Sequence, residues 1–588
     1  MLPIVIGVLA WFPSVMGFGF ALWGIYGRCV PLPSPSSKRI FVGVSGLAVL
    51  SVVANLLNFF VPINSVVALA VFVCGWLLCV RYYRRFSKDG VAVRGFLLFA
   101  LCLLACIGIT AAKPQYDYET GVYHLQSIRW ITSSNTPLGL ANLFGPYTYN
   151  SAWFSIAAML EIPLLQGKSS FVINTLLLFI YGFEIGLTAT RFKSARDVRL
   201  SDTFFLLTTI AWLGQLIGVH LNVPSADVPV VVATLLSVYI SICALESEEL
   251  ETSIGYNFIV AFIGLFLVTV KLSTIPVLLS AAALFFWNLS RARRSRAHYS
   301  SIFKPLLLLP AITACFMIIP WMLRGIVLSG CFVYPVLPTC FQSLPWTVSP
   351  TVVEREVGMI KSWSRWPWGD QDAALADWSW LGPWLERTFT PGPVLAVASI
   401  FACAGLLFWL GNRKMRLAPD ERPAYLLPLI MPIGGTIFWF FTAPDVRYGE
   451  GYLWSIFLFF LSAGVYRFYQ AYDLKNFDRL LAMAGVCLAV FILGIWPSMT
   501  PTPWPVGTPW IKNQAELHPG LGEMIFAWPA IPEPQLKANL TVESVPIFSP
   551  IYRDQCWNTS RICAPFFNKD VRIIWGANNQ PKMFYVQR

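Results

Sequence analysis

The feature that most constrains this chain is a succession of apolar stretches, separated by short polar or basic segments, along most of its 588 residues. The stretches are about 17 to 22 residues long, which is the length of a helix that crosses a hydrocarbon core about 30 Å thick. Membrane strands would be about 10 residues long and alternate in polarity, and the sequence shows no such alternation. Charged residues make up only 12% of the chain, whereas soluble domains carry about 25%. The sequence therefore predicts an all-α polytopic membrane protein.

Clusters of basic residues between the apolar stretches set the expected orientation, because cytoplasmic loops of membrane proteins carry an excess of Lys and Arg. With all clusters in the cytoplasm, the N-terminus, the loops 113–150 and 323–390 and the tail 498–588 lie outside. These loops explain the net charge of +12, so we expect a lipid bilayer and no nucleic acid as partner. The clusters lie at Arg28–Arg39, Arg81–Arg94, Arg191–Arg199, Arg291–Arg296 and Arg413–Arg422.

Counting crossings between these clusters gives about fourteen transmembrane helices, with a range of roughly 12 to 14. The apolar segment 151–165 is short and has the wrong parity to cross, so we expect a juxtamembrane or re-entrant helix on the outer face. The stretch 257–289 is expected to form two short spans that meet near Lys271 on the outer side.

The predicted organisation follows from these crossings. Extra spans in residues 1–94 precede a membrane module, 95–322, that contains the outer loop 113–150. The tail is rich in Pro and Trp and is expected to form a small mixed outer domain of short strands and loops. The remaining parts are the outer loop 323–390, the spans within 391–497 and the periplasmic tail 498–588.

Two pairs of cysteines fall on the predicted outer side. Cys331 and Cys340 share one loop, and Cys556 and Cys563 share the tail. An oxidising compartment would allow each pair to form a disulfide. Free thiols remain the alternative, because closeness in sequence does not guarantee the required geometry.

The outer loop 113–150 opens with the segment richest in chemistry. Asp117 and Glu119 lie two residues apart, close to His124 and among aromatic residues. A carboxylate at the membrane surface, with its pKa raised by the interface, can act as a general base. The alternative is structural, since acidic residues commonly cap the start of a helix.

Lys271 interrupts a long apolar stretch, and a lysine in the middle of a membrane helix costs about 2.5–3.5 kcal/mol. It therefore needs a partner such as a lipid-linked phosphate, unless it simply snorkels to the surface. Arg447, in a short outer turn with Asp445 and Glu450, can bind phosphate or pair with these neighbours. Weaker outer-face candidates are Arg324 and Asp227.

Several common catalytic motifs are missing from the sequence. It contains no Walker loop, no dinucleotide fingerprint, no zinc-ligand spacing and no Gly-x-Ser-x-Gly elbow, so nucleotide-driven pumping and serine hydrolysis lose support. Only four His are present, which excludes a His-rich metal site. We expect no required cofactor, although a divalent metal is compatible with the carboxylates.

The outer segments resemble those of the GT-C superfamily of membrane glycosyltransferases, which use polyprenyl-phosphate-linked sugars. In that family the first large outer loop carries an acidic residue and then a helix along the membrane, and Glu119 and Tyr123 have the spacing of its acidic motif. The segments Ile319–Pro335 and Asp445–Tyr448 are similar to outer segments of bacterial proteins grouped with GT-C enzymes. The resemblance covers residues 95–470, but in the family the acidic loop usually follows the first span, whereas three extra spans precede it here. The family acid is also usually Asp.

The resemblance implies a single displacement at the anomeric carbon on the periplasmic face of a bacterial inner membrane. Glu119 or Asp117 would be the base, and Lys271, Arg447 and Arg324 would hold the donor phosphate. The acceptor would be a glycan, a lipid or an outer protein such as pilin, and pilin-modifying arabinofuranosyltransferases are one class that the chain resembles. The implied substrate contacts are Tyr123, His124, Gln126, Arg129, Asp227, Asp445 and Tyr448.

Two other membrane functions fit part of the pattern. A transporter of lipid-linked glycans would show repeats and broken helices, and the large outer loops and the long tail do not fit it. An O-antigen polymerase or ligase would rely on outer-loop cations, here Arg324, Arg355, Arg365 and Arg387.

Overall fold

The computed structural model describes residues 1–28, 35–86, 117–189, 199–217, 221–294, 304–389 without 368, 424–472 and most of 525–586, with isolated residues between these ranges. In this part of the chain, nine helices are long and apolar enough to cross a membrane, and the chain is therefore a multi-pass membrane protein. The number fourteen is not confirmed, since the spans expected just before residue 113 and within 391–423 and 473–497 lie largely outside the described residues. The long helices are α1 (Leu2–Tyr26), α2 (Pro35–Asn58), α3 (Ser65–Phe86), α7 (Ile173–Ala189), α10 (Asp227–Leu245), α11 (Leu250–Val270), α12 (Leu278–Arg294), α14 (Leu309–Ser329) and α20 (Val446–Tyr472).

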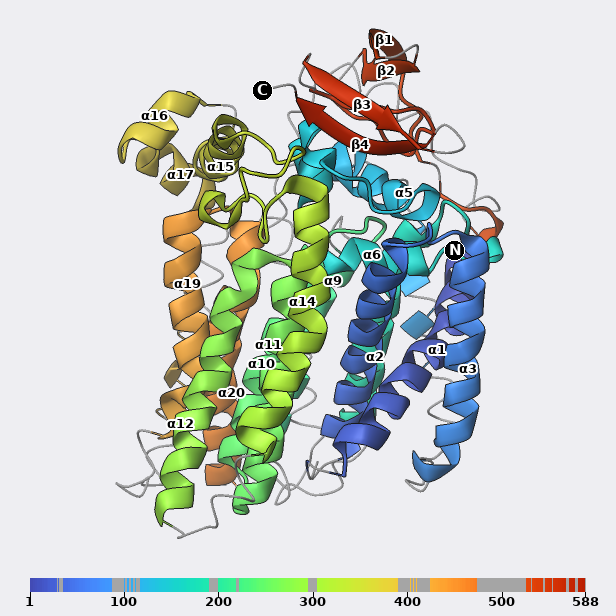
Figure 1. The fold of residues 1–588 in the computed structure, drawn as a ribbon. Helices are drawn as coiled ribbons and strands as arrows, with labels where there is room; N and C mark the ends of the chain where they lie inside the picture. Colours follow the sequence, from blue (N-terminus) through green and yellow to red (C-terminus); the bar gives the residue numbers. More distant parts are fainter. Residues whose placement is uncertain are drawn as a thin grey trace.

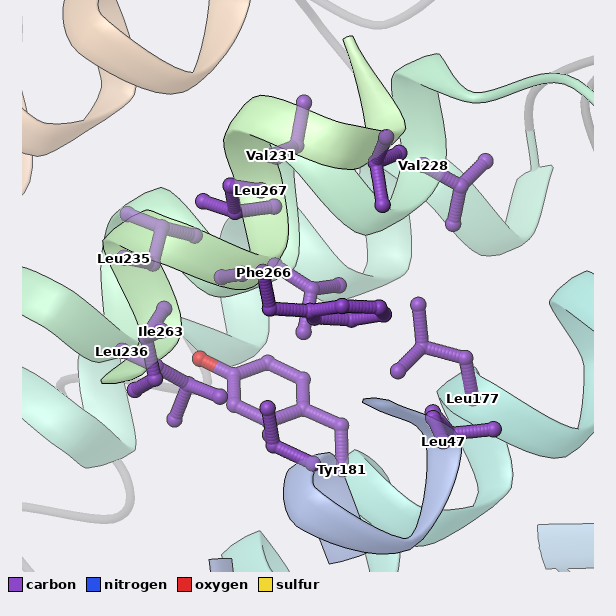
Figure 2. Packing of buried hydrophobic residues seen from close by; sticks show 14 of the residues in the cluster. Leu47, Leu177, Tyr181, Val228, Val231, Leu235, Leu236, Ile263, Phe266 and Leu267 are labelled. Atoms are coloured by element: carbon purple, nitrogen blue, oxygen red, sulfur yellow. The ribbon is translucent and has the colours of Figure 1, made fainter. Parts of the chain in front are cut away.

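Close backbone contacts and apolar side chains hold these helices together. A Cβ atom on Gly17 of α1 would lie 1.9 Å from the carbonyl oxygen of Gly75 on α3, and small residues allow membrane helices to approach this closely. Figure 2 shows Tyr181 of α7 packed among Leu236 of α10 and Ile263 of α11. This packed centre fixes the ends of α10 and α11, which carry part of the site.

The break between α11 and α12 lies where the sequence predicts it. Lys271 and the 3₁₀ turn η7 (Leu272–Val277) separate the two helices, so the apolar stretch 257–289 is divided in two. The two candidate spans are 21 and 23 residues long and thus longer than the short spans expected. The basic cluster that begins at Arg291 lies at the other end of α12.

Residues 151–165 form the short helix α6 (Ala152–Met159) and the 3₁₀ turn η4 (Pro163–Leu165), and neither is among the candidate spans of the described chain. Figure 1 shows α5 and α6 at the same end of the helical bundle as α15–α17 and the strands. The other short α-helices are α5 (Leu125–Ser133), α8 (Leu200–Leu207), α9 (Thr209–Ile217), α15 (Pro350–Arg365), α16 (Gln371–Ala376), α17 (Leu381–Thr388) and α19 (Ile430–Thr442).

The described part of the tail forms a small β structure, as the sequence predicts. Two antiparallel hairpins are present, one of β1 (Leu536–Val542) and β2 (Val545–Pro550), and one of β3 (Val571–Trp575) and β4 (Pro581–Val586). Phe584 of β4 donates its N–H to the carbonyl of Leu138 at 2.8 Å, so the tail is joined to the loop 113–150. Both predicted disulfides, Cys331–Cys340 and Cys556–Cys563, are formed.

Candidate active site

The segment that carries the two acidic residues folds into a single π-helical turn, η1 (Thr120–His124), which continues into α5. The carboxylate of Asp117 accepts hydrogen bonds from the backbone N–H of Thr120 at 2.8 Å and from its hydroxyl at 2.7 Å. Asp117 therefore caps the turn, which is the structural role that the sequence left open. Glu119 accepts no hydrogen bond from a backbone N–H of the turn, and its carboxylate has other partners.

Glu119 lies between a tyrosine of its own turn and an arginine far along the chain. Its Oε1 accepts a hydrogen bond from Nη2 of Arg447 at 2.8 Å, and its Oε2 accepts one from the hydroxyl of Tyr123 at 3.1 Å. The Glu119 side chain is 22% exposed, so a ligand can reach it. Burial raises the pKa of Glu119, but neighbouring positive charge, chiefly that of the Arg447 guanidinium, outweighs this effect, and this pKa lies below its ordinary value.

His124 lies directly beside both carboxylates. Its Nδ1 is 3.0 Å from the Thr120 hydroxyl and 3.9 Å from Asp117, and its Nε2 is 3.8 Å from Glu119. The side chain is almost completely buried, and burial lowers the pKa of His124 although the two carboxylates oppose this shift. A neutral imidazole that orients its neighbours fits these contacts better than a charged one.

Two cations meet on the ring of Tyr448, at the first turn of α20. Nζ of Lys271 lies 3.9 Å from the ring centroid and Cζ of Arg447 lies 5.0 Å from it, and aromatic faces attract cations at such distances. Lys271 is also ion-paired with Asp227, the first residue of α10. The ends of α10, α11 and α20 thus bring both cations to the acidic turn.

Arg447 pairs with Asp445, as one of the two interpretations of its sequence context predicts, and it also lies in the polar site. Besides Glu119, it pairs with Asp445, since its Nε lies 3.3 Å from Oδ1 of that residue. Asp445 also accepts the backbone N–H of Arg447 at 3.1 Å, so it shapes the start of α20. The structure therefore assembles one polar cluster, which consists of Asp117, Glu119, Tyr123, His124, Asp227, Lys271, Asp445, Arg447 and Tyr448.

Three of the site residues that the GT-C resemblance implies lie outside this polar cluster. The side-chain amide of Gln126 donates to the carbonyls of Trp557 at 2.8 Å and Thr559 at 3.1 Å, and Arg129 donates to the carbonyl of Asn558 at 3.4 Å. Both therefore hold the disulfide loop of the tail. Arg324 donates to Oδ1 of Asn150 at 2.7 Å and contacts none of the charged residues of the cluster.

A second set of contacts is made by α15, which lies in the range 323–390, and few features of the sequence indicated it. Its buried Glu356 accepts a hydrogen bond from the hydroxyl of Tyr149, whose ring lies 5.3 Å from that of Tyr123. Trp363 lies two turns further along α15, and its ring stacks on that of Tyr118, with 6.3 Å between the ring centroids. Burial raises the pKa of Glu356. The one available signal was that Glu356 follows an apolar residue by three positions, which places it on the buried face.

The arrangement places a carboxylate that can act as a base beside two cations, and the side chains of Glu119, Lys271 and Arg447 are all partly exposed. Among the described residues, no group of three or more His, Cys, Asp or Glu is placed to hold a metal ion. The cations come from side chains instead, and the geometry suits an oxyanion that would lie near Lys271 and Arg447. Such an arrangement can remove a proton at one point and hold negative charge at another.

Comparison with known proteins gives one match. The model of a family described as a domain of unknown function, DUF8201, matches residues 1–454. No curated protein and no solved structure matches the chain. The matched range contains every residue of the polar cluster and ends inside α20, so the tail lies beyond it.

Proposed function

Since the chain belongs to the DUF8201 family, whose description names no activity, we propose its function from the site itself: a membrane glycosyltransferase. It would move a sugar from a polyprenyl-phosphate donor to a hydroxyl acceptor in a glycan, a lipid or an outer protein such as pilin. The proposed location is the inner membrane of a bacterium, with the site on the periplasmic face. We also propose that the chain crosses the membrane about fourteen times and has the helix arrangement of GT-C enzymes.

The observation that carries the proposal is the approach of Glu119, Lys271 and Arg447, which come from three distant parts of the chain. A reaction that removes a proton from a hydroxyl and releases a phosphate needs one base and nearby positive charge. The cluster supplies both at the ends of membrane helices, where a donor with a lipid tail can present its phosphate. A residue set of this kind would have little use in a purely structural helical bundle.

In the proposed reaction, Glu119 takes the proton of the acceptor hydroxyl while the acceptor oxygen forms a bond with the anomeric carbon. The bond between that carbon and the phosphate oxygen breaks, and its electron pair stays on the phosphate. Lys271 and Arg447 then meet the negative charge. This single displacement inverts the configuration at the anomeric carbon.

Donor binding would also prepare the base. Arg447 pairs with Glu119 at 2.8 Å, and this pairing makes Glu119 a weaker base. A phosphate that takes over Arg447 removes part of the lowering influence on the pKa of Glu119, so the carboxylate becomes a stronger base when the donor is in place. Asp117 is bound to Thr120, and we therefore assign the base to Glu119.

The experiment compares sugar transfer by purified protein in lipid nanodiscs, using polyprenyl-phosphate-linked sugars. The Glu119→Gln variant removes the base and keeps the size of the side chain, so transfer should fall about 10²–10⁴-fold. Transfer by the Asp117→Asn variant should fall less, because the carboxamide oxygen can still accept the hydrogen bonds of Thr120. Glu354→Gln is the control, since Glu354 is an exposed residue of α15. Normal transfer by Glu119→Gln would refute the proposed base.

A further inference from the structure

Arg324 is a buried cation that lacks a partner of opposite charge. It lies in the last two turns of α14 and is 5% exposed. Its one hydrogen bond runs from Nη1 to the neutral amide oxygen of Asn150 at 2.7 Å, and its Nε is buried without a partner. No Asp or Glu within the described chain lies in ion-pair distance of it. A buried guanidinium without compensation is unfavourable, so such residues mark functional sites.

The surroundings of Arg324 are built to hold it in place. Asn150 has a positive φ of 55°, a conformation that Asn tolerates better than most residues. Its side-chain amide donates to the carbonyl of Trp321 at 2.7 Å, and the indole N–H of Trp321 donates to the carbonyl of Asn150 at 2.6 Å. These two bonds orient the amide oxygen toward Arg324. The guanidinium therefore stays fixed while the edge formed by Nε and Nη2 is left unused.

The location of Arg324 separates it from the polar cluster but keeps it close by. Ser151, the neighbour of Asn150, donates its hydroxyl to the carbonyl of Val270 at 2.8 Å, and Lys271 follows directly. The adjacent residues Asn150 and Ser151 therefore contact Arg324 and the residue before Lys271. Lys271 has Asp227 as its counter-ion, whereas Arg324 has none within the described chain.

We infer that Arg324 forms a second anion-binding site, which takes a phosphate group through the edge of Nε and Nη2. A guanidinium binds phosphate through two parallel N–H bonds, and its planar fork is better suited to this than an ammonium group. The phosphate belongs to an anionic lipid headgroup or to a soluble phosphate compound. This inference does not depend on sugar transfer, and it holds whether or not Lys271 and Arg447 bind a donor.

The site is tested by the number of inorganic phosphate ions bound per chain, measured by equilibrium dialysis of the whole protein in phosphatidylcholine nanodiscs. Arg324→Gln keeps a donor for Asn150 and removes the charge, so it should bind one phosphate fewer than the wild type. Arg387→Gln is the control, because Arg387 is exposed and donates to a backbone carbonyl. A Lys271→Met, Arg447→Gln double variant reports on the donor site separately. Equal phosphate binding by Arg324→Gln and the wild type would overturn the inference.

The same variant distinguishes a binding role from a structural one. Without phosphate, Arg324→Gln should unfold at a temperature equal to or above that of the wild type, since it removes an uncompensated buried charge. Phosphate should raise the unfolding temperature of the wild type more than that of the variant. If Arg324→Gln is instead destabilised, and Arg324→Lys restores stability with no change in phosphate binding, Arg324 is structural and the inference fails.

A second arm identifies the source of the phosphate group. The dialysis is repeated in nanodiscs that contain phosphatidylglycerol. Loss of one bound phosphate ion from the wild type, but not from Arg324→Gln, assigns the site to a lipid headgroup. An unchanged difference of one ion between the two proteins assigns it to a soluble phosphate compound.

Discussion

At the scale of residues, the account depends on how charge is shared around Glu119. The carboxylate has one strong partner, Arg447, and one hydroxyl partner, Tyr123. Sequence reasoning selected all three, because acidic and aromatic residues and a cation in short outer segments are unusual beside apolar helices. It did not predict which carboxylate pairs with which cation, since such pairing depends on how helix ends meet. Lys271 with Asp227 is the clearest example.

The pH dependence of transfer follows from this charge sharing. Glu119 acts as a base only when it is ionised, so kcat/KM should fall as the pH drops through the pKa of Glu119. In the wild type that pKa lies below its ordinary value. Arg447→Gln removes the main lowering influence and leaves burial, which raises the pKa of Glu119. The acid limb of the profile should therefore move to higher pH.

The measurement is kcat/KM against pH, which reports groups of the free enzyme. Lys361→Gln on the exposed face of α15 is a control that removes a distant cation. An acid limb that stays in place in Arg447→Gln would show that Arg447 does not set the pKa of the base.

At the scale of elements, the tail supports the turn that carries Glu119. The carbonyl of Gly121 accepts the N–H of Trp557 at 2.9 Å, and Gln126 binds two carbonyls of the same loop. A Cβ atom on Gly121 would lie 2.9 Å from the side chains of Gln555 and Trp557, so the absence of a side chain permits this contact. Sequence reasoning predicted the small outer domain and the disulfide of Cys556, but treated Gln126 as a substrate contact, because spacing along the chain cannot show what a distant tail covers.

The role of the tail can be checked without any substrate. Gln126→Ala removes two hydrogen bonds, each worth about 1 kcal/mol, so amide hydrogen exchange in residues 118–126 should become about tenfold faster or more. Gln580→Ala is the matched control, because Gln580 is exposed and binds the carbonyl of Ser133. Exchange in residues 118–126 that is as slow in Gln126→Ala as in the wild type would contradict a supporting role for the tail.

At the scale of the whole molecule, one end of the helical bundle carries α5, α6, α15–α17 and the strands of the tail (Figure 1). The turn that carries Glu119 leads directly into α5. The apolar stretches predicted the long helices well, because each must satisfy its backbone hydrogen bonds within lipid. The break at Lys271 was also predictable, since a cation interrupts the apolar run there. The packing of α15 onto Tyr149 was not predictable, because a helix with one buried face does not reveal what it packs against.

The orientation of this end is open to a direct check. Glu354→Cys places a thiol on the exposed face of α15, and Arg294→Cys places one at the last residue of α12. In intact cells, a membrane-impermeant maleimide should label Glu354→Cys at once and Arg294→Cys only after permeabilisation. The reverse order of labelling would place the polar cluster in the cytoplasm and remove the proposed periplasmic reaction.

The most direct test of the central claim is a structure of the protein in nanodiscs with a prenyl-phosphate sugar analogue that cannot react. We expect the phosphate group between Lys271 and Arg447, and the Glu119 carboxylate released from Arg447 and turned toward the anomeric carbon. An analogue bound elsewhere, or a phosphate beside a Glu119–Arg447 pair that stays intact, would contradict the account.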